Sequence, residues 1–197
     1  MEIARDFHAR GWMSGTAGNL SARADEGHFW ITASGQPKGR LGENDFLLVR
    51  IADGAVIEQA TPGNKPSAET AIHRSIYSLF PEAGACLHGH SVDGSLVSER
   101  AARAAKALRL PAIEMLKGFE IWQQNPKVDL PVFANTLDVA KIAAEIGSRF
   151  KKKPPGLSAF MVRGHGATVW GKGLQQAYNR FECLEFMLSY LARARTR

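Results

Sequence analysis

Hydrophobic residues along the chain follow two different repeats, one helical and one extended. Apolar positions recur every three or four residues in five segments, which predicts helices at residues 1–12, 68–80, 93–107, 137–150 and 174–194. Short apolar or alternating runs predict strands at residues 19–23, 29–32, 46–51, 55–58, 83–87, 111–115, 158–162 and 167–170. Helices and strands intermingle without strict alternation. We therefore expect an α/β fold in which helices pack over a central, largely antiparallel sheet.

Three histidines stand at the ends of two of the predicted strands. His88 and His90 follow the small, apolar run 83–87, and His165 lies between two glycines after the run 158–162. Two imidazoles at positions i and i+2 of a strand face the same side, so they can bind one metal ion while a third approaches from elsewhere. An isolated pair of this kind is more often two ordinary histidines. The strand context and the flanking glycines favour instead a catalytic Zn²⁺ with one open coordination position.

Composition and charge narrow the class of protein. The 197 residues are 45% hydrophobic and 22% charged, as in ordinary globular proteins, and suit one domain over residues 1–197. We expect no membrane span and no signal peptide, hence a cytoplasmic protein in which Cys86 and Cys183 stay reduced. The net charge of +6 raises nucleic acid as a partner. Much of the excess lies in residues 151–153 and at the C-terminus, where charges are usually solvated, so we expect no nucleic-acid binding.

Other polar segments carry groups that suit an anionic ligand and proton transfer. The loop 16–21 offers an amide beside a glycine, residues 32–35 offer two hydroxyls, and residues 65–70 place Ser67 at a helix N-terminus, which favours phosphate. Each segment alone is more typical of a turn or a cap. Glu69 could be a first-turn acid and Glu114 an edge-strand carboxylate. Together, the groups predict a phosphate site beside a metal, with one or two carboxylates for proton transfer.

The same motifs, in the same order, resemble the class II aldolase and adducin family over nearly the whole chain. They are residues 18–21, 32–35, 65–73, 88–90 and 163–166. The resemblance implies a three-layer fold and one zinc ion per subunit held by His88, His90 and His165. It also implies catalytic roles for Glu114 and Glu69, and phosphate contacts from Asn19, Ser34, Gly35 and Ser67. The chain departs from the aldolase pattern at Ala68, where fuculose-type aldolases usually have a second serine.

Residues 66–70, 114–122 and 164–171 resemble one subgroup of that family more closely. It implies zinc-dependent dehydration of 5-methylthioribulose 1-phosphate to 5-methylthio-2,3-dioxopentyl 1-phosphate in methionine salvage, with Glu114 as the acid/base. The family resemblance also implies a homo-oligomer, and we expect a homotetramer. The alternative within the family is an aldolase or epimerase acting on a ketose phosphate such as fuculose or ribulose phosphate. A metal-free, adducin-like interaction module is a further alternative, which retention of all three histidines disfavours.

Overall fold

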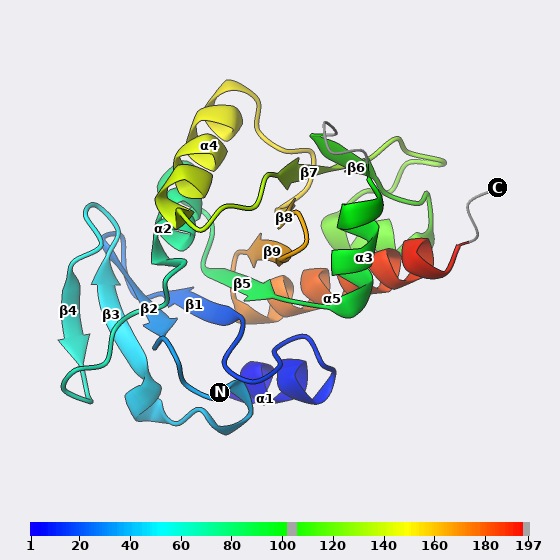
Figure 1. Ribbon diagram of the computed structural model, residues 1–197. Helices are drawn as coiled ribbons and strands as arrows, with labels where there is room; N and C mark the ends of the chain where they lie inside the picture. The colour runs from blue at the N-terminus through cyan, green and yellow to red at the C-terminus, as the bar shows by residue number, and fades with distance from the viewer. Residues whose placement is uncertain (102–105, 195–197) are drawn as a thin grey trace.

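The computed structural model describes residues 1–101 and 106–194 (Figure 1). Its α-helices are α1 (Glu2–Ala9), α2 (Thr70–Leu79), α3 (Val92–Arg100), α4 (Val139–Lys152) and α5 (Leu174–Arg193). Its strands are β1 (Asn19–Arg23), β2 (His28–Thr32), β3 (Phe46–Arg50), β4 (Val56–Gln59), β5 (Ala85–Gly89), β6 (Ala107–Arg109), β7 (Asp129–Phe133), β8 (Ala159–Val162) and β9 (Gly166–Gly171). Short 3-10 helices cover η1 (Lys38–Arg40), η2 (Glu43–Asp45) and η3 (Glu114–Phe119).

One mixed sheet runs through the centre of the molecule. Its nine strands follow the order β4-β3-β2-β1-β5-β9-β8-β7-β6. Neighbouring strands pair antiparallel except β7 and β8, which pair parallel. The expected largely antiparallel sheet is therefore confirmed. Strand β5 lies in the middle, between β1 and β9, and all five of its residues are buried.

Helices cover both faces of this sheet and make three layers. Helices α2 and α4 pack together on one face, whereas α1, α3 and α5 lie on the other (Figure 1). Two buried clusters fill the spaces between the layers. Alternation along β5 serves both: Ala85 and Leu87 belong to the cluster beneath α5, and Cys86 belongs to the cluster beneath α2. His88 has the parity of Cys86, so its side chain lies on the α2 side of the sheet.

The region after His90 differs most from the sequence-based expectation. The helix predicted over 93–107 ends at Arg100, residues 102–105 lie outside the described residues, and Ala107 opens strand β6. The strand predicted over 111–115 is wrong, because Glu114 begins the 3-10 helix η3. Leu116 and Phe119, three residues apart, both bury against the core beneath α5, which a three-residue turn allows and an extended strand does not.

Two smaller differences concern element limits. Helix α2 begins at Thr70, after the predicted start, so Ser67 is not its N-cap; the Ser67 hydroxyl instead accepts a hydrogen bond from the Glu69 amide, at 3.2 Å. Strand β7 was not predicted, since Pro131 lies in its middle and proline argues against an inner strand. Pro131 lies opposite Ala107 of the short strand β6, and the hydrogen bond beside it comes from the Val132 amide, which donates to the Lys106 carbonyl at 2.9 Å. Among the described residues, no helix is both long enough and apolar enough to cross a membrane.

Candidate metal centre

Four side chains from three parts of the chain meet at the C-terminal end of β5. Glu69 precedes α2, His88 is the last residue but one of β5, His90 follows the strand, and His165 lies in the turn between β8 and β9. One potential ligand atom from each lies within 4.8 Å of the others. The three predicted histidines are thus brought together, and Glu69 joins them.

Strand register explains how residues distant in sequence converge there. His88 lies opposite Asn19 of β1 and opposite Thr168 of β9. The Thr168 hydroxyl lies 3.0 Å from His88 Nδ1, which fixes the ring and leaves Nε2 facing the other histidines. Glycine at position 166 permits close approach of β9, because a Cβ there would lie 2.3 Å from the carbonyl oxygen of Gly89.

The donor atoms form a set that suits a divalent cation. His88 Nε2 lies 2.8 Å from His90 Nε2 and 3.2 Å from Glu69 Oε2, and His165 Nε2 lies 3.4 Å from Glu69 Oε1. Glu69 Oε1 is buried and has no hydrogen-bond partner. A buried carboxylate oxygen without a partner is costly unless a cation compensates it. Three imidazoles and one carboxylate are ligands that zinc and similar divalent metals accept.

Protonation of the group follows from its burial. Desolvation lowers the pKa values of His88 and His90, so both rings are neutral near pH 7, as metal ligands must be. Burial by itself would raise the pKa of Glu69, but His88, His165 and the hydrogen bond from Asn19 together outweigh burial and lower it. Glu69 is therefore a carboxylate, and the group combines neutral nitrogen donors with one negative oxygen.

The residues expected to bind phosphate lie near this group in two connected loops. The amide of Ser34 donates to the Lys65 carbonyl at 2.8 Å, and the amide of Ser67 donates to the Thr32 carbonyl at 3.2 Å. Ser34 lines a cavity of about 430 Å³ together with residues 63–66 and 68, and Gly35 and Ser67 adjoin these residues in sequence. Asn19 is not among the residues that line this cavity. Its side-chain amide lies at the metal centre instead, where it contacts Glu69 and His73.

Glu114 is separate from the metal centre within the chain. It is the first residue of η3, its side chain is exposed, and its carboxylate pairs with Lys117 Nζ at 2.7 Å. The hydrogen bond from Lys117 lowers its pKa. Glu114 lines a small cavity with Trp122 and does not belong to the group of four. Within one chain, therefore, the two predicted catalytic carboxylates are not brought together.

An apolar cavity adjoins the histidines. It has a volume of about 650 Å³ and reaches His90 and His165 on one side and Val92, Leu96 and Leu137 on the other. Leu137 is fully exposed and Val92 largely so. A metal-binding group and an apolar wall thus share one open cavity.

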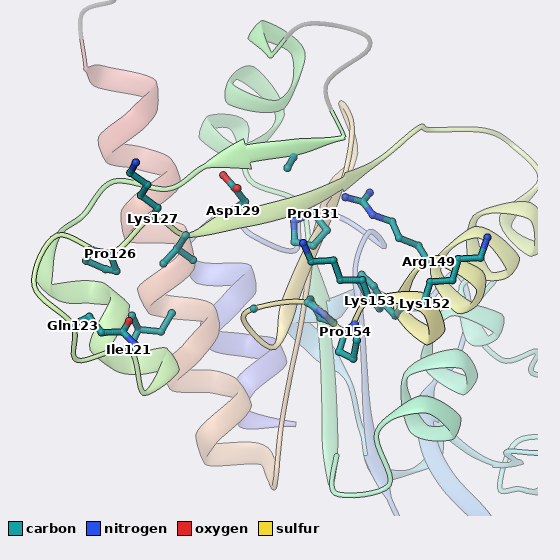
Figure 2. Close-up of a pocket in the computed structure, with 15 residues that line it drawn as sticks. Ile121, Gln123, Pro126, Lys127, Asp129, Pro131, Arg149, Lys152, Lys153 and Pro154 are labelled. Atoms are coloured by element: carbon teal, nitrogen blue, oxygen red, sulfur yellow. The ribbon is translucent and has the colours of Figure 1, made fainter.

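Another cavity, of about 860 Å³, lies between β6, β7 and the end of α4. Four cationic side chains line it, but they do not converge. Figure 2 shows Lys127 and Lys152 pointing outward on opposite sides, while Arg149 and Lys153 turn toward Pro131. The Arg149 guanidinium already donates to the carbonyls of Val132 and Lys106. We therefore do not propose that this cavity binds an anion.

Sequence reasoning missed two polar residues beside the metal centre. Thr168 orients His88, and His73 is wholly buried behind Asn19. The spacing of these residues in the sequence could have indicated that they lie beside the site. Residues 69, 73 and 77 are four apart, so Glu69, His73 and Tyr77 share one face of a helix, and Thr168 is the strand residue that pairs with His88.

Comparisons with known proteins agree with this geometry. Residues 1–191 match the family model described as class II aldolase and adducin N-terminal domain. A protein of Microcystis aeruginosa named methylthioribulose-1-phosphate dehydratase is 56% identical over 191 residues, covering 97% of this chain and 92% of that protein. One of the same name from Leptospira biflexa is 41% identical, covering 98% and 94%.

Solved structures share the fold. L-fuculose-1-phosphate aldolase from Thermus thermophilus superposes with a TM-score of 0.73 at 28% identity, covering 96% of this chain and 90% of that one. The YgbL protein of Klebsiella pneumoniae superposes with a TM-score of 0.80 at 26% identity, covering 100% and 89%.

Proposed function

Because the chain belongs to the class II aldolase and adducin family, with residues 1–191 matching its model, we propose that it is a metal-dependent hydro-lyase that removes water from 5-methylthioribulose 1-phosphate. The observation that carries the proposal is the group formed by Glu69, His88, His90 and His165 in a chain 56% identical to a relative named methylthioribulose-1-phosphate dehydratase. The product would be 5-methylthio-2,3-dioxopentyl 1-phosphate, an intermediate of methionine salvage.

The metal in this proposal is one Zn²⁺ per subunit. The three histidines would hold it, with Glu69 as the neighbouring carboxylate. A bound divalent cation supplies Lewis-acid polarisation of a ketone oxygen and of the carbon beside it. The donor set supports zinc, because three imidazoles and one carboxylate are ligands that zinc accepts.

The chain's own residues then bind the substrate and move protons. The cavity lined by Ser34 and Lys65 would take the phosphate. Dehydration needs the C3 proton removed and the C4 hydroxyl protonated so that it leaves as water; the resulting enol tautomerises to the 2,3-diketone. Glu69 is the carboxylate that lies with the three histidines, where it could take up or deliver a proton. Glu114 keeps its proposed acid/base role if it comes from a neighbouring subunit, since in its own chain it lies apart.

The apolar cavity beside the histidines suits the other end of the substrate. Val92, Leu96 and Leu137 offer methyl groups next to His90 and His165. A methylthio group is apolar and needs such a wall. The phosphate cavity adjoins Glu69 through Ala68, whereas the apolar cavity adjoins His90. A substrate that is polar at one end and apolar at the other therefore fits across the metal centre.

The direct test is dehydration by the purified, zinc-loaded protein. We expect incubation with 5-methylthioribulose 1-phosphate to give a product lighter by one water, detected by mass spectrometry, and fuculose 1-phosphate to remain intact. Cleavage of a ketose phosphate to dihydroxyacetone phosphate, without any dehydration, would favour the aldolase alternative instead.

Two variants separate these chemistries further. In the dehydratase, Glu114→Gln should lower kcat by about 10²–10⁴-fold, the range for loss of general acid–base catalysis. Zinc content and folding should be unchanged because Glu114 is not proposed as a ligand. In an aldolase that relies on Glu69, Glu69→Gln would be the damaging change and Glu114→Gln would be mild.

A further inference from the structure

A line of buried polar side chains runs from the Glu69 carboxylate into the protein interior. Asn19 Nδ2 donates to Glu69 Oε2 at 2.5 Å, and Asn19 Oδ1 lies 2.5 Å from His73 Nε2. Ser21 Oγ lies 2.6 Å from His73 Nδ1 and 2.8 Å from the Tyr77 hydroxyl. All five side chains are buried, and His73 has no exposed surface.

Two elements build this line by simple periodicity. Glu69, His73 and Tyr77 are four residues apart and lie on one face of α2 and the turn before it. Asn19 and Ser21 are two residues apart and lie on one face of β1. The β1 residues interleave with the α2 residues, so each hydrogen bond joins the strand to the helix.

One set of proton positions satisfies the four contacts along the line; the Ser21 hydroxyl then donates to His73 and not to the Cys86 carbonyl, which lies 3.3 Å away. The Glu69 carboxylate can only accept, so the Asn19 NH₂ group must face it and the Asn19 carbonyl must face His73. His73 Nε2 must then carry a proton, and Nδ1 must accept from Ser21, which in turn accepts from Tyr77. Burial lowers the pKa of His73 to about 3, so the ring is neutral and able to donate at one nitrogen and accept at the other.

We propose that His73, Ser21 and Tyr77 are positioning residues, which act through Asn19 to hold the Glu69 carboxylate in one orientation at the metal centre. Oε2 is anchored by Asn19, whereas Oε1 has no hydrogen-bond partner and faces His165 Nε2 at 3.4 Å. A carboxylate held in this orientation presents only Oε1 to a metal ion or to a substrate proton. A freely rotating carboxylate would present either oxygen. The inference rests on the proposed function in one respect, that Glu69 takes part in metal binding or catalysis.

The same line of buried side chains limits how Asn19 could contact a substrate phosphate. Both ends of its amide have protein partners, and its side chain is almost fully buried. A substrate phosphate could reach only the second N–H of the same NH₂ group. The contacts therefore give Asn19 a second role, in which it transmits the position of His73 to Glu69.

The test measures Zn²⁺ affinity by competition with a chromophoric chelator, together with kcat and KM for dehydration. His73→Leu removes the donor to Asn19, and we expect metal affinity or kcat to fall by about 10–100-fold, the range for groups that orient metal ligands. His73→Gln places an N–H near the position of Nε2 and should recover most of the loss. Tyr77→Phe removes only the terminal hydroxyl and should give a smaller loss in the same direction. Ser75→Ala is the matched control, because Ser75 lies on α2 but bonds to Ala71 and Ala143 outside the line.

A double-mutant cycle distinguishes positioning from a structural role. If His73 and Tyr77 act through Glu69, then whichever of zinc affinity and kcat falls in His73→Leu and Tyr77→Phe should fall no further when these changes are made in a Glu69→Gln background. Equal losses in both backgrounds would overturn the inference. His73→Leu is a buried change, so Tyr77→Phe carries the test if that variant does not fold. If Glu69→Gln alone changes neither zinc affinity nor kcat, the role proposed for Glu69 fails, which is seen before any cycle is completed.

Discussion

The carboxyl group of Glu185 lies on the buried side of α5, where the Ser91 hydroxyl is its polar neighbour. Burial raises its pKa from 4.5 to about 7; the Ser91 hydroxyl opposes this shift and Asp93 adds to it. The folded state therefore keeps a proton that the unfolded state releases above about pH 4.5. The contribution of Glu185 to the free energy of unfolding is therefore complete below about pH 4.5, and it is lost as the pH rises through about 7.

Glu185→Gln should remove this pH dependence, since glutamine has the same shape and no charge. A shift of this size corresponds to about 3 kcal/mol, so the variant should be more stable than the wild type by up to that amount above pH 7 and nearly equal at pH 4. Urea unfolding from pH 4 to pH 8.5 measures the difference. Glu182→Gln is the control, because Glu182 lies on the same helix but pairs with Arg10 near the surface. A difference between wild type and Glu185→Gln that does not vary with pH would contradict this account.

The metal ligands make a second prediction at the scale of single residues. His165→Ala removes one of three imidazoles, and we expect zinc affinity to fall by at least about tenfold and activity to fall with it. Metal content after dialysis against a chelator measures the first effect. His28→Ala is the control, since His28 pairs with Asp25 at the surface. Full zinc occupancy together with normal turnover in His165→Ala would remove His165 from the site.

At the scale of elements, the short distance between β5 and β9 determines how closely His88, His90 and His165 approach one another. A Cβ at position 166 would lie 2.3 Å from the Gly89 oxygen and 2.9 Å from His90 Cδ2. Gly166→Ala must therefore push β9 away from β5, the strand that carries His88. We expect a loss of about 1–3 kcal/mol in the free energy of unfolding, with weaker zinc binding.

Gly147→Ala is the matched control for that change. A Cβ at position 147 meets no atom within 4 Å, and the residue lies inside helix α4. Alanine should raise stability there by about 0.5–1 kcal/mol, because glycine is the poorer helix former. Thermal unfolding and chelator competition on both variants measure the contrast; a Gly166→Ala protein that keeps its stability and zinc affinity would show that the close approach is not needed.

At the scale of the whole molecule, the separation of Glu114 from the metal centre predicts that the complete site lies between copies of the chain. Apolar side chains are exposed beside both parts: Trp122 lines the cavity with Glu114, and Val92 and Leu137 line the cavity with His90. Contacts between copies would bury these residues. We propose a homo-oligomer, with a homotetramer as the expected form.

Mixed oligomers test this arrangement. Glu69→Gln and Glu114→Gln homo-oligomers should each be inactive as dehydratases. If Glu114 acts on a neighbour's metal centre, subunits exchanged between the two form sites with both native carboxylates, and activity should return to about a quarter of the wild-type value in a random ring. Light scattering on the mixture verifies that exchange has kept the subunit number. Exchange without any recovery would place both carboxylates in one subunit or remove Glu114 from catalysis.

The sequence by itself determined the parts of this protein that depend on local periodicity and local chemistry. Short apolar or alternating runs predicted strands β1 to β5, β8 and β9, and three- or four-residue spacing predicted α1, α2, α4 and α5, because such patterns are set by which faces must be buried. The pair His88 and His90 at the end of a buried strand, with His165 between glycines, predicted the histidines that converge. The family also followed from the order of these motifs, which the model match over residues 1–191 confirms.

Only the tertiary structure decided which distant groups meet. The register of β1, β5 and β9 places Asn19 and Thr168 across from His88, and no local pattern encodes pairing between strands more than 60 residues apart. The segment after His90 was predicted wrongly because its apolar residues bury against α5, and that contact makes 114–119 a 3-10 helix. For Glu69 the sequence left two interpretations, a first-turn acid or, from the family resemblance, a catalytic carboxylate. Packing brings its side chain to the three histidines, and burial and partners determine what a carboxylate does.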